Sequence, residues 1–252
     1  MITVYTFGSA WGAVDLSPFV VKLLTWLRMA GVPHGTALGD MRKAPQRKLP
    51  YIEDGGRLIG DSSLIIEHIL AKEPSLRLAG DDLPPPLAAV AAAFKGMIES
   101  ELYFVIVYTR WAVDLGYATY RPVLVSSLAK MGLPAALVSL ALPLLRRRMI
   151  AQVYEQGMGR HERGVIFAKG RRHIDAIAAY LADKPYFMGD EPGTIDATVF
   201  GFLDALTSTP LCPLLTDHVL QHANLAAYHA RMWGRYWSDV APPAASSAKP
   251  RR

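Results

Sequence analysis

The sequence predicts two domains, a small α+β domain followed by an all-helical domain. Short runs of β-branched and aromatic residues and a glycine hairpin signal fall within about the first 75 residues. From Leu87 to about Val240 the apolar residues recur with a helical period. We therefore expect domains at residues 1–78 and 87–240, joined by a proline-rich linker at 79–86 and followed by a disordered tail at 241–252.

The first domain begins with a strand, a helix and a second strand. The run ITVYTFG (2–8) predicts the first strand, and HGTALG (34–39) is compatible with a short second one. Between them, Ser17 stands where an N-cap residue is expected, and Pro18 occupies the first helical position. Gly31 marks the end of this helix.

A hairpin and a second helix complete this domain. Residues 51–54 (YIED) and 57–60 (RLIG) predict two short strands, and the Gly-Gly pair between them is a strong turn signal. Asp61 and Ser62 then begin a helix rich in leucine and isoleucine.

Composition excludes several classes of protein. The formal net charge is +5, and part of it lies in the tail and in residues 146–148, so no basic face for nucleic acid is expected. The single cysteine, Cys212, rules out an internal disulfide and a multi-cysteine metal cluster. No signal peptide is recognisable at the start, and we expect a reducing, cytoplasmic location.

Apolar residues are abundant, at 51% of the chain, which fits an oligomer interface, an apolar ligand site or membrane contact. The apolar run 132–145 would reach only about 21 Å as a helix, against about 30 Å of bilayer hydrocarbon. We expect it to be buried in the helical domain. The alternative is peripheral membrane contact through residues 132–148, with the arginines 146–148 at the lipid headgroups.

Taken together, these motifs resemble the glutathione S-transferase superfamily. Residues 2–78 look like its thioredoxin-fold N-terminal domain, and residues 87–240 are similar to its all-helical C-terminal domain. The segments that most resemble the branch of failed-axon-connections proteins and metaxins are 17–33, 48–69, 157–161 and 184–203. That branch includes members regarded as non-catalytic, so the resemblance is more specific for fold than for activity.

The resemblance gives Ser17 a catalytic role. Thioredoxin-like redox proteins begin this helix with Cys-Pro-x-Cys, whereas this chain has Ser17-Pro18-Phe19-Val20, which excludes disulfide exchange here. A serine hydroxyl can instead donate a hydrogen bond to the thiolate of glutathione. A thiol with a pKa of about 8.5 is ~3% ionised at pH 7, and lowering that pKa by about two units requires ~2.7 kcal/mol. A hydrogen bond from the serine hydroxyl to the thiolate contributes about 1.5–3 kcal/mol, and together with the helix N-terminus it can supply this free energy. The alternative is that Ser17 only caps the helix.

Two further motifs would hold the rest of glutathione. The resemblance implies a cis Leu49–Pro50 bond that turns the Leu49 backbone toward the cysteinyl unit. It also assigns the γ-glutamyl end to Asp61 and Ser62, the first pairing with the ammonium group and the second with the carboxylate. A helix cap without ligand is the alternative for this pair. Lys48, with neighbouring Arg47, is a weaker candidate for the glycine carboxylate.

Residues 103–111 (YFVIVYTRW) are expected to face the cleft between the domains. Tyr103, Tyr108, Arg110 and Trp111 are candidates for binding an apolar acceptor. The alternative is core packing for the aromatic residues and a surface or interface role for Arg110. Asp196, three residues after Gly193, reads as a structural helix cap. His218 and His222 lie four residues apart, but no third ligand accompanies them in the sequence, so we predict no metal site.

The sequence therefore predicts a cytoplasmic glutathione transferase-like enzyme, a homodimer by analogy, that uses glutathione as co-substrate against a small apolar electrophile. One alternative is a non-catalytic binding or scaffold protein of the metaxin type, associated with a membrane through residues 132–148. Another is a glutathione-dependent reductase or isomerase, because the same glutathione site serves several chemistries. The role of the segment 115–165 stays open.

Overall fold

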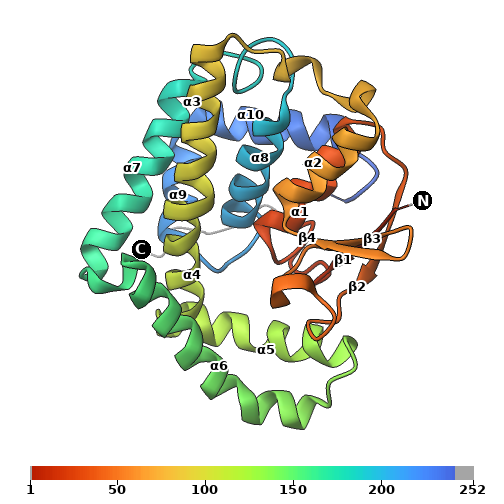
Figure 1. Ribbon diagram of the computed structural model, residues 1–252. Helices are drawn as coiled ribbons and strands as arrows, with labels where there is room; N and C mark the ends of the chain where they lie inside the picture. Colours follow the sequence, from red (N-terminus) through yellow and green to blue (C-terminus); the bar gives the residue numbers. More distant parts are fainter. Residues whose placement is uncertain (1, 242–252) are drawn as a thin grey trace.

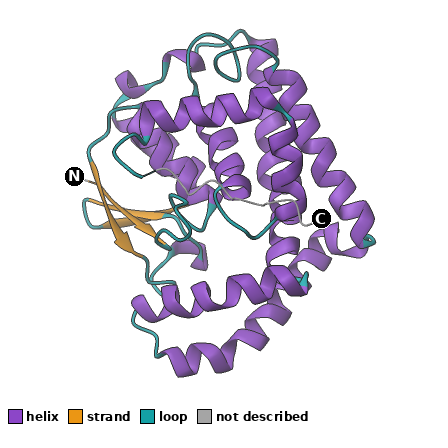
Figure 2. Ribbon diagram, turned by 180° about the vertical axis from the view of Figure 1, so that it is seen from behind, coloured by secondary structure: helices purple, strands orange, loops and turns teal. Residues whose placement is uncertain are grey.

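The computed structural model describes residues 2–241 and begins with a four-stranded sheet (Figures 1 and 2). The strands are β1 (Ile2–Thr6), β2 (His34–Leu38), β3 (Tyr51–Asp54) and β4 (Arg57–Gly60), in the order β2-β1-β3-β4. β2 runs parallel to β1, whereas β3 is antiparallel to both β1 and β4. The parallel pair is connected through α1 (Pro18–Met29), and α2 (Ser62–Lys72) follows β4. The predicted strand–helix–strand–hairpin–helix order is confirmed.

The hairpin between β3 and β4 forms because both turn residues adopt left-handed conformations. Gly55 has φ of 59° and Gly56 has φ of 80°. A two-residue turn with positive φ at both positions matches the twist of the flanking strands, and glycine adopts it without strain. The turn aligns Tyr51 with Gly60, which places the start of β3 beside the end of β4.

Helices make up the remainder of the described chain. α3 (Pro85–Gly96) continues through a π-helical stretch, Met97–Leu102, into α4 (Tyr103–Trp111). The helices that follow are α5 (Asp114–Lys130), α6 (Ala135–Gln156), α7 (Arg163–Leu181), α8 (Thr194–Thr207), α9 (Pro213–Gln221) and α10 (Ala223–Tyr236). The predicted domain boundaries stay predictions; of the tail, all but residue 241 lies outside the described residues.

The segment 115–165 forms mainly the two helices α5 and α6, which lie at the bottom of Figure 1. The predicted burial of the run 132–145 is wrong for most of its residues: only Val138 and Leu142 of this run are buried, because α6 packs against α4 and α5 with one face. Leu137, Leu140 and Leu144 instead face solvent, with 61%, 76% and 69% of their surface exposed. Among the described residues no helix combines the length and apolar character needed to cross a membrane.

Helix α1 packs against α8, and a glycine makes this contact possible. A Cβ atom at Gly201 of α8 would lie 2.7 Å from the carbonyl oxygen of Pro18 and 2.9 Å from the nitrogen of Lys22. Both atoms belong to the backbone of α1 and cannot move aside, so only glycine allows this approach. Farther along α1, the fully buried Trp26 donates a hydrogen bond from Nε1 to Oγ1 of Thr194, at 3.0 Å. The helical domain therefore fixes the position of α1.

A buried ion pair also links α1 to the helical domain. Nζ of Lys22, which has no exposed surface, lies 2.7 Å from Oε1 of Glu99 and 2.7 Å from Oγ of Ser63 in α2. Burial lowers the pKa of Lys22, and the Glu99 carboxylate opposes that change. The ammonium group thus ties α1 and α2 to the start of the helical domain, and removing Glu99 would leave a buried charge unpaired.

Helix α8 begins with the structural cap that the sequence predicts. Asp196 is fully buried, and its carboxylate accepts hydrogen bonds from the backbone of Gly193 at 2.9 Å and of Phe187 at 2.7 Å. The hydroxyl of Tyr228 in α10 donates to the same carboxylate at 2.8 Å. Gly193 stands at the N-cap in place of the usual serine or threonine, so no N-cap side chain contributes. The Asp196 carboxylate alone supplies the side-chain part of the capping box.

The connection from β1 to α1 folds around Asp15, whose surface is only 1% exposed. Its Oδ2 accepts a hydrogen bond from the backbone N–H of Gly8 at 2.7 Å, and its Oδ1 accepts one from the N–H of Ser17 at 2.8 Å. Burial raises the pKa of Asp15 to about 7, although the backbone hydrogen bonds and the charge of Arg110 act in the opposite direction. A single carboxyl group therefore sets the start of α1.

Replacing Asp15 by asparagine should remove part of the pH dependence of stability. Because the pKa of Asp15 is raised by folding, the folded protein holds a proton between about pH 4 and pH 7 that the unfolded chain has released. This proton stabilises the fold at low pH, and the stabilisation is lost as the pH rises through about 7. From pH 5 to pH 8, the unfolding free energy of the wild type should fall by about 2–3 kcal/mol more than that of Asp15→Asn, measured by urea denaturation.

The histidines contribute equally to the pH dependence of both proteins, so their contribution cancels in the difference between wild type and Asp15→Asn. Equal pH dependence in the two proteins would contradict the assignment, because Asp15 would then keep an ordinary pKa.

Candidate functional site

Strand pairing brings three predicted motifs to one end of the sheet. Tyr5 near the end of β1 pairs with Tyr51 at the start of β3, and Tyr51 pairs with Gly60 at the end of β4. The loop to Ser17 therefore leaves the sheet at the edge where Pro50 enters and Asp61 leaves. Tyr5, Tyr51 and Gly60 are far apart in sequence but lie side by side, because antiparallel strands begin and end next to each other.

Ser17 occupies the N-cap position of α1, but its hydroxyl does not cap the helix. The side chain makes no capping hydrogen bond, and the backbone oxygen accepts from the N–H groups of Val20 and Val21, each at 3.1 Å. The Ser17 N–H is already held by Asp15. Of the two roles weighed for this residue, the side-chain cap is therefore absent. Ser17 is half-buried, and its contact with a ligand stays a prediction.

The loop before β3 has the backbone form that the resemblance implies. The Leu49–Pro50 peptide bond is cis, and both residues are buried. Lys48 and Arg47 precede them and are exposed. Their predicted contact with a carboxylate stays a prediction.

Asp61 is the N-cap residue of α2. Its Oδ1 accepts hydrogen bonds from the backbone N–H of Ser63 at 2.8 Å and of Leu64 at 3.3 Å. The capping role is thus present, and the exposed carboxylate still presents Oδ2 to a ligand. Ser62, the first helical residue, is 3% exposed. This pair offers an acidic group and a helix N-terminus beside the cis proline.

Two of the four candidates on α4 face the start of α1. Tyr103 and Arg110 are seven residues apart and share a helix face. The ring of Tyr103 contacts that of Phe19 edge to face, with 4.9 Å between centroids. Arg110 is 6% exposed and donates from Nη1 to the backbone oxygen of Leu16 at 2.7 Å. Of the surface or interface role considered for Arg110, the surface role is therefore wrong: the guanidinium is inside the protein, against the residue before Ser17.

The other two candidates on α4 point elsewhere. Trp111 is 7% exposed and packs against Tyr117 and Tyr120 of α5, with ring centroids 6.1 and 5.5 Å apart. Tyr108 is half-buried and lies edge to face with Phe167 of α7, at 6.4 Å. Core packing, the alternative that the sequence offered for these aromatic residues, accounts for the contacts of Trp111 and Tyr108.

Sequence reasoning missed two residues that shape the site. Asp15 lies in the loop SAWGAVDL, where an aspartate reads as an ordinary loop residue, and only the fold shows that it binds two backbone segments. Lys22 lies on the otherwise apolar face of α1, and a lysine in that place is a signal for a buried charge. Its partner Glu99 is 77 residues away in sequence.

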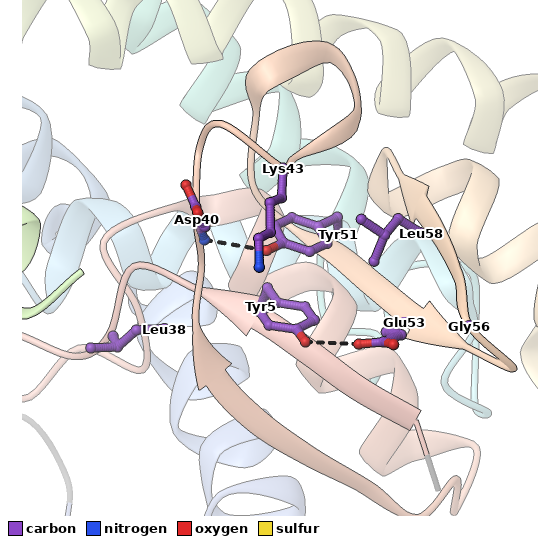
Figure 3. Close-up of a pocket in the computed structure, with 8 residues that line it drawn as sticks. All are labelled: Tyr5, Leu38, Asp40, Lys43, Tyr51, Glu53, Gly56 and Leu58. Atoms are coloured by element: carbon purple, nitrogen blue, oxygen red, sulfur yellow. Dashed lines mark hydrogen bonds between the residues drawn. The ribbon is translucent and has the colours of Figure 1, made fainter. Parts of the chain in front are cut away.

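A hollow lies elsewhere, on the sheet face that carries Tyr5 and Tyr51 (Figure 3). It has a volume of about 400 Å³. The rings of Tyr5 and Tyr51 stack there at 4.3 Å, and the Tyr5 hydroxyl donates to Oε2 of Glu53 at 3.0 Å. The full lining is Tyr5, Leu38, Asp40, Lys43, Tyr51, Glu53, Gly56 and Leu58. None of the predicted glutathione-binding side chains belongs to it.

Comparison with known sequences agrees with the geometry. The glutathione S-transferase N-terminal domain matches residues 18–116, and the C-terminal domain of the same proteins matches residues 170–232. The isoprene-epoxide–glutathione S-transferase of Rhodococcus sp. is 34% identical over 94% of this chain and 99% of its own. Failed axon connections of Drosophila melanogaster is 27% identical over 95% of this chain and 59% of its own. Metaxin-1 of Macaca fascicularis is 25% identical over 98% and 80%.

Solved structures show the same architecture. A glutathione S-transferase from Methylobacterium radiotolerans, in complex with glutathione sulfonate, aligns with a TM-score of 0.60 at 19% identity and covers 100% of this chain and 99% of its own. A beta-etherase from Sphingobium sp. aligns with a TM-score of 0.62 at 13% identity, over 92% and 94%. At these identities the likeness concerns the fold alone. The sequence matches show the family as well as the fold: this chain belongs to the glutathione S-transferase family.

Proposed function

We propose that this protein is a glutathione S-transferase that uses Ser17 to stabilise the thiolate of glutathione. One observation carries the proposal: the Ser17 hydroxyl stands at the start of α1 and does not cap it. The cysteinyl unit would lie against Leu49 and Pro50, and the γ-glutamyl unit against Asp61 and Ser62. We place the enzyme in the cytoplasm as a homodimer, by analogy with the family.

The surroundings of Ser17 favour an anion. The hydroxyl belongs to the N-cap residue, at the positive end of α1, and the buried Arg110 guanidinium contacts the neighbouring Leu16 carbonyl. A hydrogen bond to a charged acceptor contributes about 1.5–3 kcal/mol, which converts to a thiol pKa lower by about one to two units. No general base is required, because a thiol in this range loses its proton to water at neutral pH.

The electrophile would lie beyond Ser17, near the aromatic edge formed by Phe19 and Tyr103. The name of the Rhodococcus relative, an isoprene-epoxide transferase, makes a small apolar epoxide the first substrate to try. The thiolate sulfur would form a bond to an epoxide carbon while the C–O bond at that carbon breaks. The oxygen would then take a proton from water, which gives a hydroxy thioether.

Ser17→Ala should raise the pKa of bound glutathione while the protein stays folded. Loss of the hydrogen bond should lower kcat/KM for an epoxide or an aromatic halide by about 10- to 100-fold at pH 7, and less at higher pH where free thiolate forms. The thiol pKa is read from thiolate absorbance on a pH titration of the complex. Ser9→Ala, an exposed serine in the same loop, is the matched control and should behave as wild type. Equal pH–rate profiles for Ser17→Ala and wild type would refute the role.

Asp61→Asn separates ligand binding from capping. Asparagine caps helices as well as aspartate does and tolerates the φ of 70° found here, so stability should change by only a few tenths of a kcal/mol. The lost charge should weaken glutathione binding by about tenfold, with kcat nearly unchanged. Calorimetric titration with glutathione and thermal unfolding measure the two effects. Unchanged affinity would show that Asp61 serves α2 alone.

The non-catalytic alternative has one structural feature in its favour, the exposed leucines 137, 140 and 144 of α6. Such a stripe suits a membrane surface or another protein, and two relatives carry names that state no catalytic activity. The enzyme should be retained on immobilised glutathione and should not float with lipid vesicles. Flotation that Leu140→Asp abolishes, without turnover of any electrophile, would favour the scaffold.

A further inference from the structure

A cluster of three metal-ligating groups lies in the helical domain, on elements the transferase chemistry does not use. Oδ1 of Asp175 in α7 is 2.7 Å from Nε2 of His218 and 2.9 Å from Nε2 of His222. His218 is on α9, and His222 joins α9 to α10. All three ligand atoms lie within 4.8 Å of one another. The sequence pattern of His218 and His222 lacks a third ligand. Asp175 of α7, 43 residues before His218, supplies it.

The backbone around the cluster holds these groups in place. Asn224, two residues after His222, donates from Nδ2 to the carbonyl oxygens of Ala178 and Ala182, at 2.8 and 3.0 Å. These bonds fasten the α9–α10 junction to the end of α7, and Ala178 lies less than one helical turn after Asp175. The two imidazole rings lie edge to face, with centroids 5.3 Å apart. Both Nε2 atoms contact the carboxylate of Asp175. A site built on packed helices needs little reorganisation to bind an ion.

We propose that Asp175, His218 and His222 form a binding site for a divalent transition metal such as Zn²⁺. Two imidazoles and one carboxylate on a solvent-accessible surface leave a fourth, tetrahedral position for water. At Zn²⁺ bond lengths of about 2.0–2.1 Å, tetrahedral ligand atoms are about 3.3 Å apart, so the distance from Oδ1 of Asp175 to each Nε2 atom must grow by about half an ångström. The ion would replace the Nε2 protons and join α7, α9 and α10.

The electrostatics of the cluster suit a cation. Asp175 is an exposed acidic residue, and both imidazoles contact the same carboxylate oxygen, Oδ1. His218 and His222 are 18% and 28% exposed, which leaves an entry path from solvent. Because imidazole must be neutral to bind a metal, affinity should fall as the solution becomes acidic.

Zn²⁺ titration of the full chain, free of any affinity tag and first treated with a chelator, tests the proposal. We expect one equivalent to bind, measured by competition with a chromophoric chelator, and a higher Tm in the loaded protein. Asp175→Asn, which keeps the shape of the side chain, and His222→Gln should each weaken binding by at least about tenfold. Both should also abolish the rise in Tm.

His68→Ala is the matched control, because His68 forms a single histidine–aspartate pair with Asp54, at 2.8 Å, without a second imidazole. Its Zn²⁺ affinity should equal that of the wild type. Circular dichroism of the metal-free variants establishes that they fold. Absence of Zn²⁺ binding to the wild type at 100 µM, or equal affinity in wild type, Asp175→Asn and His222→Gln, would overturn the proposal, and neither result bears on Ser17.

Discussion

The packing of α1 against α8 is the contact on which the rest of the structure depends. Gly201 lets the two backbones approach so closely that any side chain there would collide with Pro18 and Lys22. One helix thereby belongs to both halves of the fold: it covers the sheet, and its far side is buried in the helical domain. This packing fixes the start of α1. Residues far away in sequence therefore determine the position of the Ser17 hydroxyl.

Polar groups around this contact fix the remaining degrees of freedom. Asp15 holds the chain that enters α1, and Arg110 holds the Leu16 carbonyl from the opposite side. Lys22 and Glu99 join α1 to the helical domain through a buried ion pair. Such pairs contribute little net stability but are costly to break, so they favour one relative arrangement of the parts. A preorganised donor at Ser17 is what thiolate stabilisation requires.

Local sequence patterns were enough to predict the elements, because hairpin glycines, proline at a helix start and helical periodicity act within a few residues. Ser17, Asp61 and Ser62 could be found the same way, with the resemblance supplying their chemistry. The long-range contacts could not. Arg110 reads as a surface residue on an aromatic helix, yet it is buried because the fold brings Leu16 to it. Asp175 carries no local sign of its meeting with His218 and His222, since that depends on how α7 and α9 pack.

The central claim is that the sulfur of glutathione lies against the hydroxyl that opens α1. A crystal structure of the protein soaked with glutathione tests it most directly. The account predicts the sulfur within hydrogen-bond distance of Ser17 Oγ, with the γ-glutamyl carboxylate at the N-terminus of α2. Glutathione bound with its sulfur remote from Ser17, or a Ser17 hydroxyl turned into the protein beside an empty cis-proline edge, would contradict it.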